Sequence, residues 1–352
     1  MKNRGKHYSG QDSKRKDKNG KEENRQAMTS GIGKSLREAA GLIALTGTCA
    51  GAGALIGAAG HFYKFALTPK KHDPRRDSMP SEKEYTAGRR WMKEHPLRED
   101  VFIRADDSLH LHGSYIPADH KEEAEHRFAV CVHGYAEACE SMGLYASVYH
   151  DRYGMNVLLP DLRGHGRSDG DYVGMGYDDS RDLLRWIDWI LEKDPSATII
   201  LHGISMGAAA VLMTTGYPLP DQVRAAVSDS AYTSAMEVLS SAYRSLDEAV
   251  IPAPVMLESL RAIALVRAGY DIAKAAPVRA VASSKTPTLF IHGQADDFVP
   301  PRMMPALYKA ASCTKAFLWI PEAGHVQSVN VDPETYWARV ERFLHAQDIP
   351  LM

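Results

Sequence analysis

From about residue 100 onward, short apolar runs alternate with longer segments in which apolar and polar positions are mixed. Runs of a length suited to buried strands occupy 128–132, 198–204, 225–227, 286–292 and 315–321. The segment 177–192 instead repeats Leu183, Leu184, Ile187 and Ile190 at helical spacing. Strands that alternate with helices predict an α/β fold, with a mostly parallel sheet and helices on both faces.

Two stretches depart from this alternation. Residues 101–104 and 109–115 alternate apolar and polar positions around a polar turn, which predicts a β-hairpin. Residues 232–282 hold more than fifty positions of helical character with Pro252 and Pro254 in the middle, which predicts a helical insertion (the cap) between two strands. The apolar residues of the cap, such as Met256 and Leu260, either contact a hydrophobic substrate or bury the cap on the core.

The run 198–204 ends in a Gly-x-Ser-x-Gly motif, which is followed at once by three alanines. Such a strand, turn and small-residue helix force a serine, here Ser205, into an exposed and strained corner. Gly203 and Gly207 are needed because a Cβ atom at either position would collide across so tight a bend. Ser205 is therefore the candidate nucleophile.

Its expected partners follow in the order acid and then histidine. Asp296 comes shortly after the run 286–292, and His325 comes shortly after the run 315–321. An imidazole can accept the serine proton, and a carboxylate can orient and stabilise that imidazole. Asp296 is favoured as the acid because it lies three residues before Val299, where the chain re-enters ordered structure, while Asp297 and Asp229 are the rivals.

A tetrahedral intermediate also needs hydrogen-bond donors for its negative oxygen. The backbone N–H groups of Met206 and Tyr135 are the candidates, because Met206 begins the helix after the serine and Tyr135 follows the strand 128–132. The side chains of Tyr135 and His133 either contact the substrate or only shape this loop.

Five motifs in register make the chain similar to α/β-hydrolase-fold serine hydrolases of the serine aminopeptidase-like and monoacylglycerol-lipase-like branch. They are His133–Tyr135, Asp161–Ser168, Gly203–Gly207, Gly293–Asp296 with Val299–Pro300, and Gly324–His325. The resemblance covers about residues 98–346. It implies an eight-stranded sheet of this fold, with the insertion 232–282 as a cap over the active site. It also implies that the charged residues of Asp161–Ser168 pack near the site without taking part in the chemistry.

Charge is distributed unevenly along the chain. Residues 1–37 carry eleven Lys or Arg and four acidic residues, whereas the whole chain has a formal net charge of −2. This basic head has few apolar residues, which predicts disorder. Residues 39–60 contain no charged side chain, and Phe62 and Tyr63 follow them. The pattern predicts a transmembrane helix over 38–67 with membrane contact through 39–63, unless the segment is a cleaved signal peptide.

The basic excess before the span predicts a single-pass cell-membrane protein with a cytoplasmic N-terminus and an extracytoplasmic catalytic domain. A charged, proline-rich linker over 68–99, with a helix at 81–94, then leads to a hydrolase domain over 100–350. No cofactor, metal or nucleic-acid partner is predicted, and the oligomeric state is left open. The leading functional hypothesis is a serine hydrolase of carboxylic esters, including acylglycerols or other lipid-like esters. The alternatives are an amidase or aminopeptidase, for which Glu237, Asp247, Glu248 and Glu258 are weak amine-binding candidates, and a non-catalytic binding protein.

Overall fold

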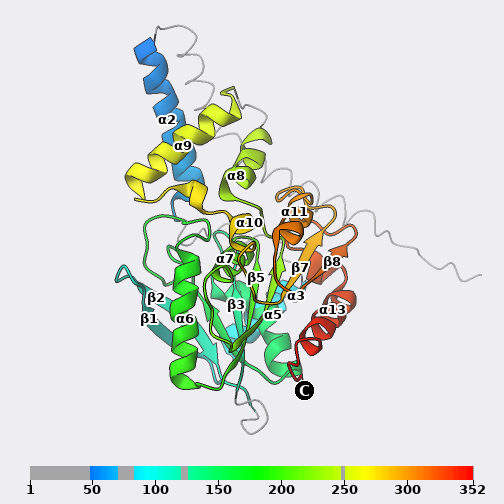
Figure 1. Ribbon diagram of the computed structural model, residues 1–352. Helices are drawn as coiled ribbons and strands as arrows, with labels where there is room; N and C mark the ends of the chain where they lie inside the picture. The colour runs from blue at the N-terminus through cyan, green and yellow to red at the C-terminus, as the bar shows by residue number, and fades with distance from the viewer. Residues whose placement is uncertain (1–47, 70–82, 120–125, 247–249, 352) are drawn as a thin grey trace, which may run out of the picture.

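The computed structural model describes residues 48–69, 83–119, 126–246 and 250–351. In these ranges the chain forms an eight-stranded sheet with the order β1-β2-β4-β3-β5-β6-β7-β8 (Figure 1). Its strands are β1 (Glu99–Arg104), β2 (His110–Ile116), β3 (Arg127–Val132), β4 (Asn156–Pro160), β5 (Thr198–Ile204), β6 (Val223–Asp229), β7 (Thr288–Gly293) and β8 (Lys315–Ile320). The strands from β3 to β8 are parallel, and β2 pairs antiparallel with β1 and β4. The predicted sheet and the predicted hairpin are confirmed.

Helices cover both faces of the sheet because its central strands are buried on both sides. In β3, Phe128 and Val130 belong to the cluster beneath α6 and α7, while Ala129 and Cys131 belong to the cluster beneath α5 and α13. The bounds of these four helices are α5 (Gly143–Ser147), α6 (Asp179–Lys193), α7 (Met206–Thr214) and α13 (Pro333–His345). Two shorter helices, α11 (Met303–Ala310) and α12 (Ser328–Val331), also belong to the domain. Two short helical turns, η1 (Cys139–Met142) and η2 (Val148–Arg152), flank α5.

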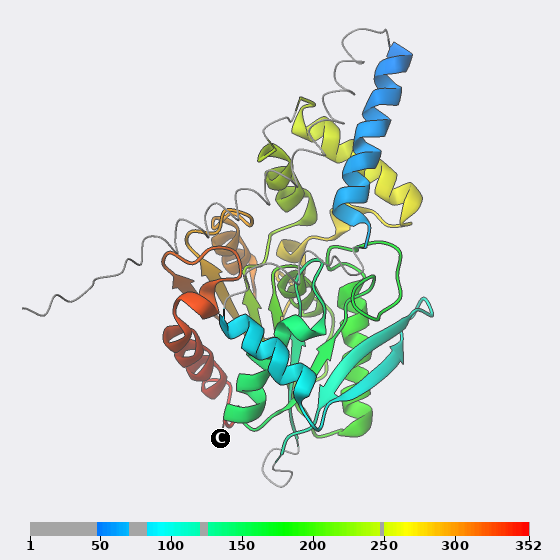
Figure 2. The same ribbon diagram turned by 180° about the vertical axis from the view of Figure 1, so that it is seen from behind.

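Part of the predicted linker is a helix docked on this domain. Helix α3 (Lys83–Glu94) crosses α5 on the face seen in Figure 2. The backbones meet so closely that a Cβ atom on Gly88 would lie 2.2 Å from the backbone nitrogen of Leu144. Met92 is fully buried in the contact. The predicted helix is therefore present, and packing rather than linker composition decides its position.

Between β6 and β7 the chain forms α8 (Ala235–Arg244), α9 (Ala253–Arg267), η3 (Ile272–Lys274) and α10 (Pro277–Ala280). These helices occupy the region predicted as a cap. Met256 and Leu260 of α9 are completely buried, whereas Leu265 and Val266 are exposed. Met256 and Leu260 therefore follow the second interpretation of the apolar cap residues, in which these side chains bury the cap against the rest of the protein.

Helix α2 (Thr48–Leu67) joins the cap. It packs against α9, and in both ribbon views α2 stands up from the domain while α9 crosses it obliquely (Figures 1 and 2). Ala58, Ala59, Phe62 and Ala66 form a buried stripe at helical spacing. The Phe62 ring meets the ring of Tyr243 in α8 edge-on, with 5.5 Å between the ring centroids. Helix α2 is thus packed as a third helix of the cap.

The structure gives no support to the predicted transmembrane helix over 38–67, of which it describes residues 48–67. No helix in the described ranges is both long and apolar enough to cross a bilayer. Glycine and alanine, which add little apolar surface, supply much of α2, and His61 and Lys64 lie in its last two turns. Residues 1–47 lie outside the described residues, so the cytoplasmic position of the basic head and the extracytoplasmic position of the hydrolase domain stay predictions.

Candidate active site

Ser205 lies at the sharp corner between β5 and α7, with backbone angles φ 51° and ψ −117°. A Cβ atom on Gly203 would lie 2.4 Å from the carbonyl oxygen of Gly207, and one on Gly207 would lie 2.2 Å from the carbonyl oxygen of Val132. Both distances are sterically forbidden, so the predicted need for these two glycines is confirmed. The Ser205 backbone N–H donates to the Asp229 carbonyl oxygen at 2.9 Å, which ties the corner to β6.

The structure brings Ser205, His325 and Asp296 into one hydrogen-bonded row. The Nε2 atom of His325 lies 2.9 Å from the Ser205 Oγ atom, and its Nδ1 atom lies 2.8 Å from Oδ2 of Asp296. The Asp296 side chain is fully buried, while 22% of the His325 side chain is exposed. The rival Asp297 is exposed. The chain therefore places Asp296, rather than its neighbour, against the imidazole.

Asp296 is surrounded by hydrogen-bond donors. Its Oδ1 atom accepts the backbone N–H groups of Phe298 and Val299 at 3.0 and 2.8 Å. Its Oδ2 atom faces the Nε2 atom of His292 at 3.1 Å as well as His325. Burial alone would raise the pKa of Asp296, but the hydrogen bonds from the two imidazoles outweigh burial and hold it well below its usual range.

The second imidazole, that of His292, is a feature that sequence reasoning missed. Its Nε2 atom also lies 3.0 Å from the Val299 carbonyl oxygen. Both neighbours of Nε2 are acceptors, so this nitrogen carries the proton. The available signal was the spacing, since His292 lies in β7 four positions before the acid and at the same edge of the sheet.

The two predicted oxyanion donors lie beside Ser205. Met206 is the first residue of α7, where a backbone N–H has no carbonyl partner within the helix. The loop of Tyr135 leaves β3 next to Ser205. The short distance is shown by Gly134, where a Cβ atom would lie 3.4 Å from the Ser205 Cβ atom. The Tyr135 hydroxyl donates to the Phe65 carbonyl oxygen of α2 at 3.0 Å. The side chain of Tyr135 is thus engaged with the cap.

Two neutral histidines hold the Tyr135 loop to the Asp161–Ser168 segment. His165 donates from Nδ1 to the Arg163 carbonyl oxygen at 2.9 Å and accepts the Ala136 N–H at Nε2 at 3.0 Å. His133 accepts the Leu162 N–H at its Nε2 atom at 3.0 Å. Burial lowers the pKa of His133, which keeps it neutral for this task. The segment therefore has a structural connection to the loop of Tyr135.

Two clusters away from Ser205 combine residue types that bind metals. They are His112 with Cys139 and Asp161, and His95 with His150 and Asp151. Asp161 already accepts hydrogen bonds from the Nδ1 atom of His112 and the backbone N–H of Cys139, both at 2.7 Å. The two nitrogens of His150 lie 2.7 Å from Asp151 Oδ1 and 3.0 Å from the Pro117 carbonyl oxygen. Protein hydrogen bonds account for these atoms.

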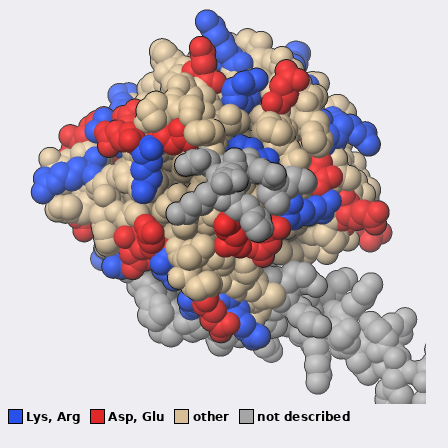
Figure 3. Space-filling model, turned by 90° about the horizontal axis from the view of Figure 1, so that it is seen from below, with Lys and Arg blue, Asp and Glu red and all other residues tan. Residues whose placement is uncertain are grey.

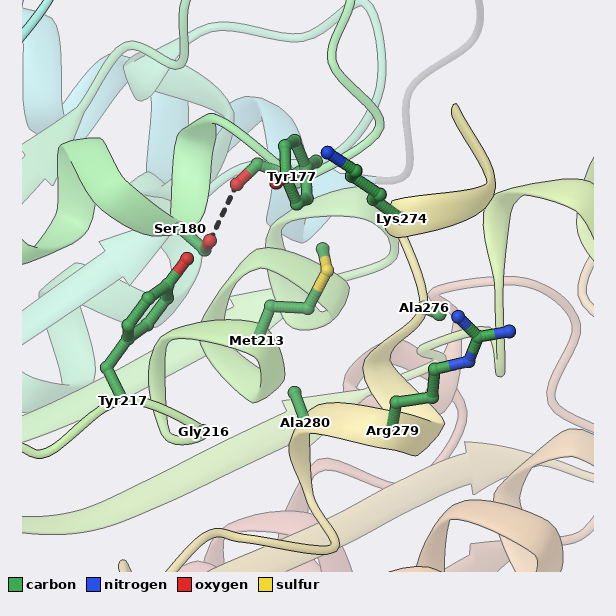
Figure 4. Close-up of a pocket in the computed structure, with 9 residues that line it drawn as sticks. All are labelled: Tyr177, Ser180, Met213, Gly216, Tyr217, Lys274, Ala276, Arg279 and Ala280. Carbon is green, nitrogen blue, oxygen red and sulfur yellow. Dashed lines mark hydrogen bonds between the residues drawn. The ribbon is translucent and has the colours of Figure 1, made fainter. Parts of the chain in front are cut away.

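A cavity of about 250 Å³ lies at the far end of α7 from Ser205 (Figure 4). In Figure 4 the Lys274 side chain reaches toward Tyr177, and Met213 projects between them and Ala280. No triad residue lines this cavity, and Lys274 and Arg279 at its rim are exposed. On the face opposite the cap, basic and acidic side chains are interspersed (Figure 3).

Comparison with known proteins agrees with this geometry. The sequence of residues 129–339 matches the alpha/beta hydrolase family. The uncharacterized protein YqkD of Bacillus subtilis is 31% identical over 193 residues, which cover 54% of this chain and 62% of that protein. The Arabidopsis thaliana alpha/beta hydrolase domain-containing protein WAV2 is 29% identical over 196 residues, which cover 54% of this chain and 60% of that protein. The chain thus spans about three fifths of the length of these two relatives.

Solved structures share the fold. The esterase Pf2001 of Pyrococcus furiosus superposes with a TM-score of 0.56 at 22% identity, covering 71% of this chain and 92% of the esterase. An acylaminoacyl peptidase of Pyrococcus horikoshii superposes with a TM-score of 0.51 at 21% identity, covering 74% of this chain and 43% of the peptidase. At these identities the likeness concerns the fold alone.

Proposed function

The chain belongs to the alpha/beta hydrolase family, and from this premise we propose that it is a serine hydrolase that cleaves carboxylic esters through an acyl-enzyme. The observation that carries the proposal is the row Ser205, His325, Asp296, with contacts of 2.9 and 2.8 Å at the carboxyl ends of β5, β8 and β7. A nucleophile, a base and an orienting carboxylate thus lie within hydrogen-bond reach of one another.

The proposed reaction has two halves. His325 accepts the Ser205 proton at Nε2 while Oγ attacks the ester carbonyl carbon, and the carbonyl oxygen becomes negative. The backbone N–H groups of Met206 and Tyr135 receive this oxygen. When the C–O bond breaks, His325 returns the proton to the leaving alkoxide, and Ser205 remains acylated. A water molecule then repeats the sequence, giving the carboxylic acid and free Ser205.

The polarity of the cap favours esters over substrates with a free amine. Recognition of an amine would need carboxylates gathered over the site, but Glu237 contacts Thr233 and Arg302, and Glu258 contacts Arg261. The other candidates, Asp247 and Glu248, lie outside the described residues. The helices that stand over the carboxyl edge of the sheet are rich in apolar side chains, so we propose an ester with an apolar, lipid-like acyl group as the substrate.

A fluorophosphonate probe tests the proposal directly, because it labels only an activated serine. We expect labelling of the wild-type protein, no labelling of Ser205→Ala, and normal labelling of Ser147→Ala, whose hydroxyl bonds the Leu144 carbonyl away from the site. Hydrolysis of p-nitrophenyl esters of rising chain length, compared with aminoacyl anilides, then separates the esterase from the amidase. Absence of labelling that depends on Ser205 would overturn the enzyme proposal, and faster turnover of the anilides would overturn ester specificity.

A further inference from the structure

The C-terminal end of α2 contacts two connections of the hydrolase domain, the one after β3 that holds Tyr135 and the one between β4 and α6 that holds Gly164 and Val173. The Tyr135 hydroxyl donates to the Phe65 carbonyl oxygen at 3.0 Å, and the Val173 backbone N–H donates to the Leu67 carbonyl oxygen at 2.8 Å. A Cβ atom on Gly164 would lie 2.9 Å from the side chain of Pro69, the second residue after the helix. Phe65 and Leu67 lie in the last turn of α2, where backbone carbonyls accept hydrogen bonds from outside the helix. The loops of the site thus cap this helix.

Helix α2 precedes the part of the chain that matches the alpha/beta hydrolase family, residues 129–339. Its contact with Tyr135 therefore joins a segment outside the matched region to a loop within it. The partner it reaches is also specific, because Tyr135 carries one of the two backbone N–H groups expected to receive the oxyanion. A tyrosine side chain has only two torsions between its backbone and its ring, so fixing the hydroxyl restricts the backbone as well.

We propose that α2 is a working part of the hydrolase site, in which the Phe65 carbonyl fixes Tyr135 so that its backbone N–H stays aimed at the substrate carbonyl oxygen. This inference rests on the proposed hydrolase function. Oxyanion donors accelerate a reaction only when they are held in place before charge develops. Tyr135 is then a positioning residue through its side chain, in addition to the role of its backbone.

Packing explains how α2 itself is held. Phe62 meets Tyr243 of α8, and the guanidinium of Arg267 in α9 lies over the Tyr63 ring, 5.4 Å from its centroid. Phe62 and Tyr63 lie within one turn before Phe65, whose carbonyl accepts the Tyr135 hydroxyl, and their partners lie on the facing helices α8 and α9. The position of the cap helices is thereby linked to the geometry of the oxyanion site.

The first test uses Tyr135→Phe in the full-length chain, which removes the hydroxyl and keeps the ring and the backbone N–H. We expect kcat for a p-nitrophenyl ester and the rate of fluorophosphonate labelling to fall together by about fivefold to tenfold, with KM within about twofold of wild type. The control is Tyr153→Phe, which removes a hydroxyl that bonds Glu341 at 3.0 Å on the opposite side of the molecule. It should leave kcat unchanged.

The second test concerns the helix. Phe62→Leu weakens the packing of α2 on Tyr243 while keeping an apolar side chain, and we expect it to lower kcat in the same direction. Combined with Tyr135→Phe, it should cause no further loss, because both changes break one contact. Wild-type kcat in Tyr135→Phe, or losses that simply multiply in the double variant, would overturn the inference while Ser205-dependent labelling still upheld the hydrolase. A wild-type protein without such labelling would overturn the hydrolase proposal and this inference with it.

Discussion

Asp229 and Asp296 stand at the same edge of the sheet and yet have opposite properties. Asp229 ends β6, and Asp296 follows the neighbouring strand β7 by three residues. Both are buried, and both were candidates for the acid of the triad. The pKa of Asp296 lies well below its usual range, whereas the pKa of Asp229 is raised to about 6.

Desolvation raises the pKa of both carboxyls, and the hydrogen-bond donors outweigh it only at Asp296. Asp296 accepts two backbone N–H groups and faces two imidazoles, so its charged form is stabilised. At Asp229 desolvation dominates, and the hydroxyls of Ser230 (2.9 Å) and Tyr336, together with the more distant imidazoles of His292 and His325, do not offset it. Near neutral pH, Asp296 is therefore the better partner for an imidazolium.

The largest effect is expected when the charge of Asp296 is removed. Asp296→Asn keeps the size of the side chain, but its amide cannot accept at every position where the carboxylate does, and it favours the wrong tautomer of His325. We expect kcat to fall about a thousandfold to ten-thousandfold with little change in KM. Steady-state kinetics on a p-nitrophenyl ester measures both constants.

Asp297→Asn is the matched control, because it makes the same chemical change at the adjacent exposed position. Activity close to wild type is expected. If the control lost activity and Asp296→Asn kept it, the assignment of the acid would be reversed.

A smaller effect is expected at His292, whose Nε2 atom lies 3.1 Å from Asp296. His292→Leu removes a donor that stabilises the carboxylate, so the pKa of Asp296 should rise toward its usual value. Asp296 works as a carboxylate, so kcat/KM falls when Asp296 becomes protonated. On acidification, this fall should begin at a higher pH in His292→Leu than in the wild-type protein. At pH 7 we expect a loss of about tenfold, since one hydrogen bond to a charged group is removed.

The pH profile of kcat/KM between pH 4 and pH 8 measures both effects. His292→Gln serves as the conservative control, because its amide N–H can donate to Asp296 and to the Val299 carbonyl, and it should recover most of the activity. Identical profiles for His292→Leu and wild type would show that the second imidazole leaves Asp296 unaffected.

Much of this site could be predicted because its signals are local. Buried strands show as short apolar runs, and the tight turn at Ser205 requires Gly203 and Gly207 for steric reasons visible in sequence. The order of Ser205, Asp296 and His325 along the chain follows from the fold. The sequence favours Asp296 over Asp297, but the donors that distinguish the two positions come from Phe298, Val299 and the imidazoles in three dimensions.

Features that depend on distant partners could not be predicted in this way. An uncharged segment rich in glycine and alanine is compatible with a membrane span or with a helix packed on protein, and the contact of Phe62 with Tyr243 of α8 joins residues that are far apart in the sequence. The acceptor at Phe65 is a backbone carbonyl, which leaves no trace in the choice of side chain. His292 carried a spacing signal, but its role depends on where the loop of Asp296 folds back.

The smallest effect on activity is expected at Asp229, where the comparison predicts a change in stability instead. The folded-state pKa of about 6 lies above the unfolded value of about 4, so the stabilising contribution of this group is present below pH 4 and is lost as the pH rises through 6. Asp229→Asn keeps an acceptor for Ser230 and removes the titration. Relative to wild type, its free energy of unfolding should therefore increase between pH 4 and pH 7.5, by up to about 3 kcal/mol, while kcat stays within about twofold.

Urea unfolding at both pH values measures this difference in the free energy of unfolding. The control Asp106→Asn, which alters a side chain that is 75% exposed, should show no such difference. A large loss of kcat in Asp229→Asn, with a stability difference that does not change with pH, would mean that Asp229 is charged in the native protein and that His325 depends on both carboxylates.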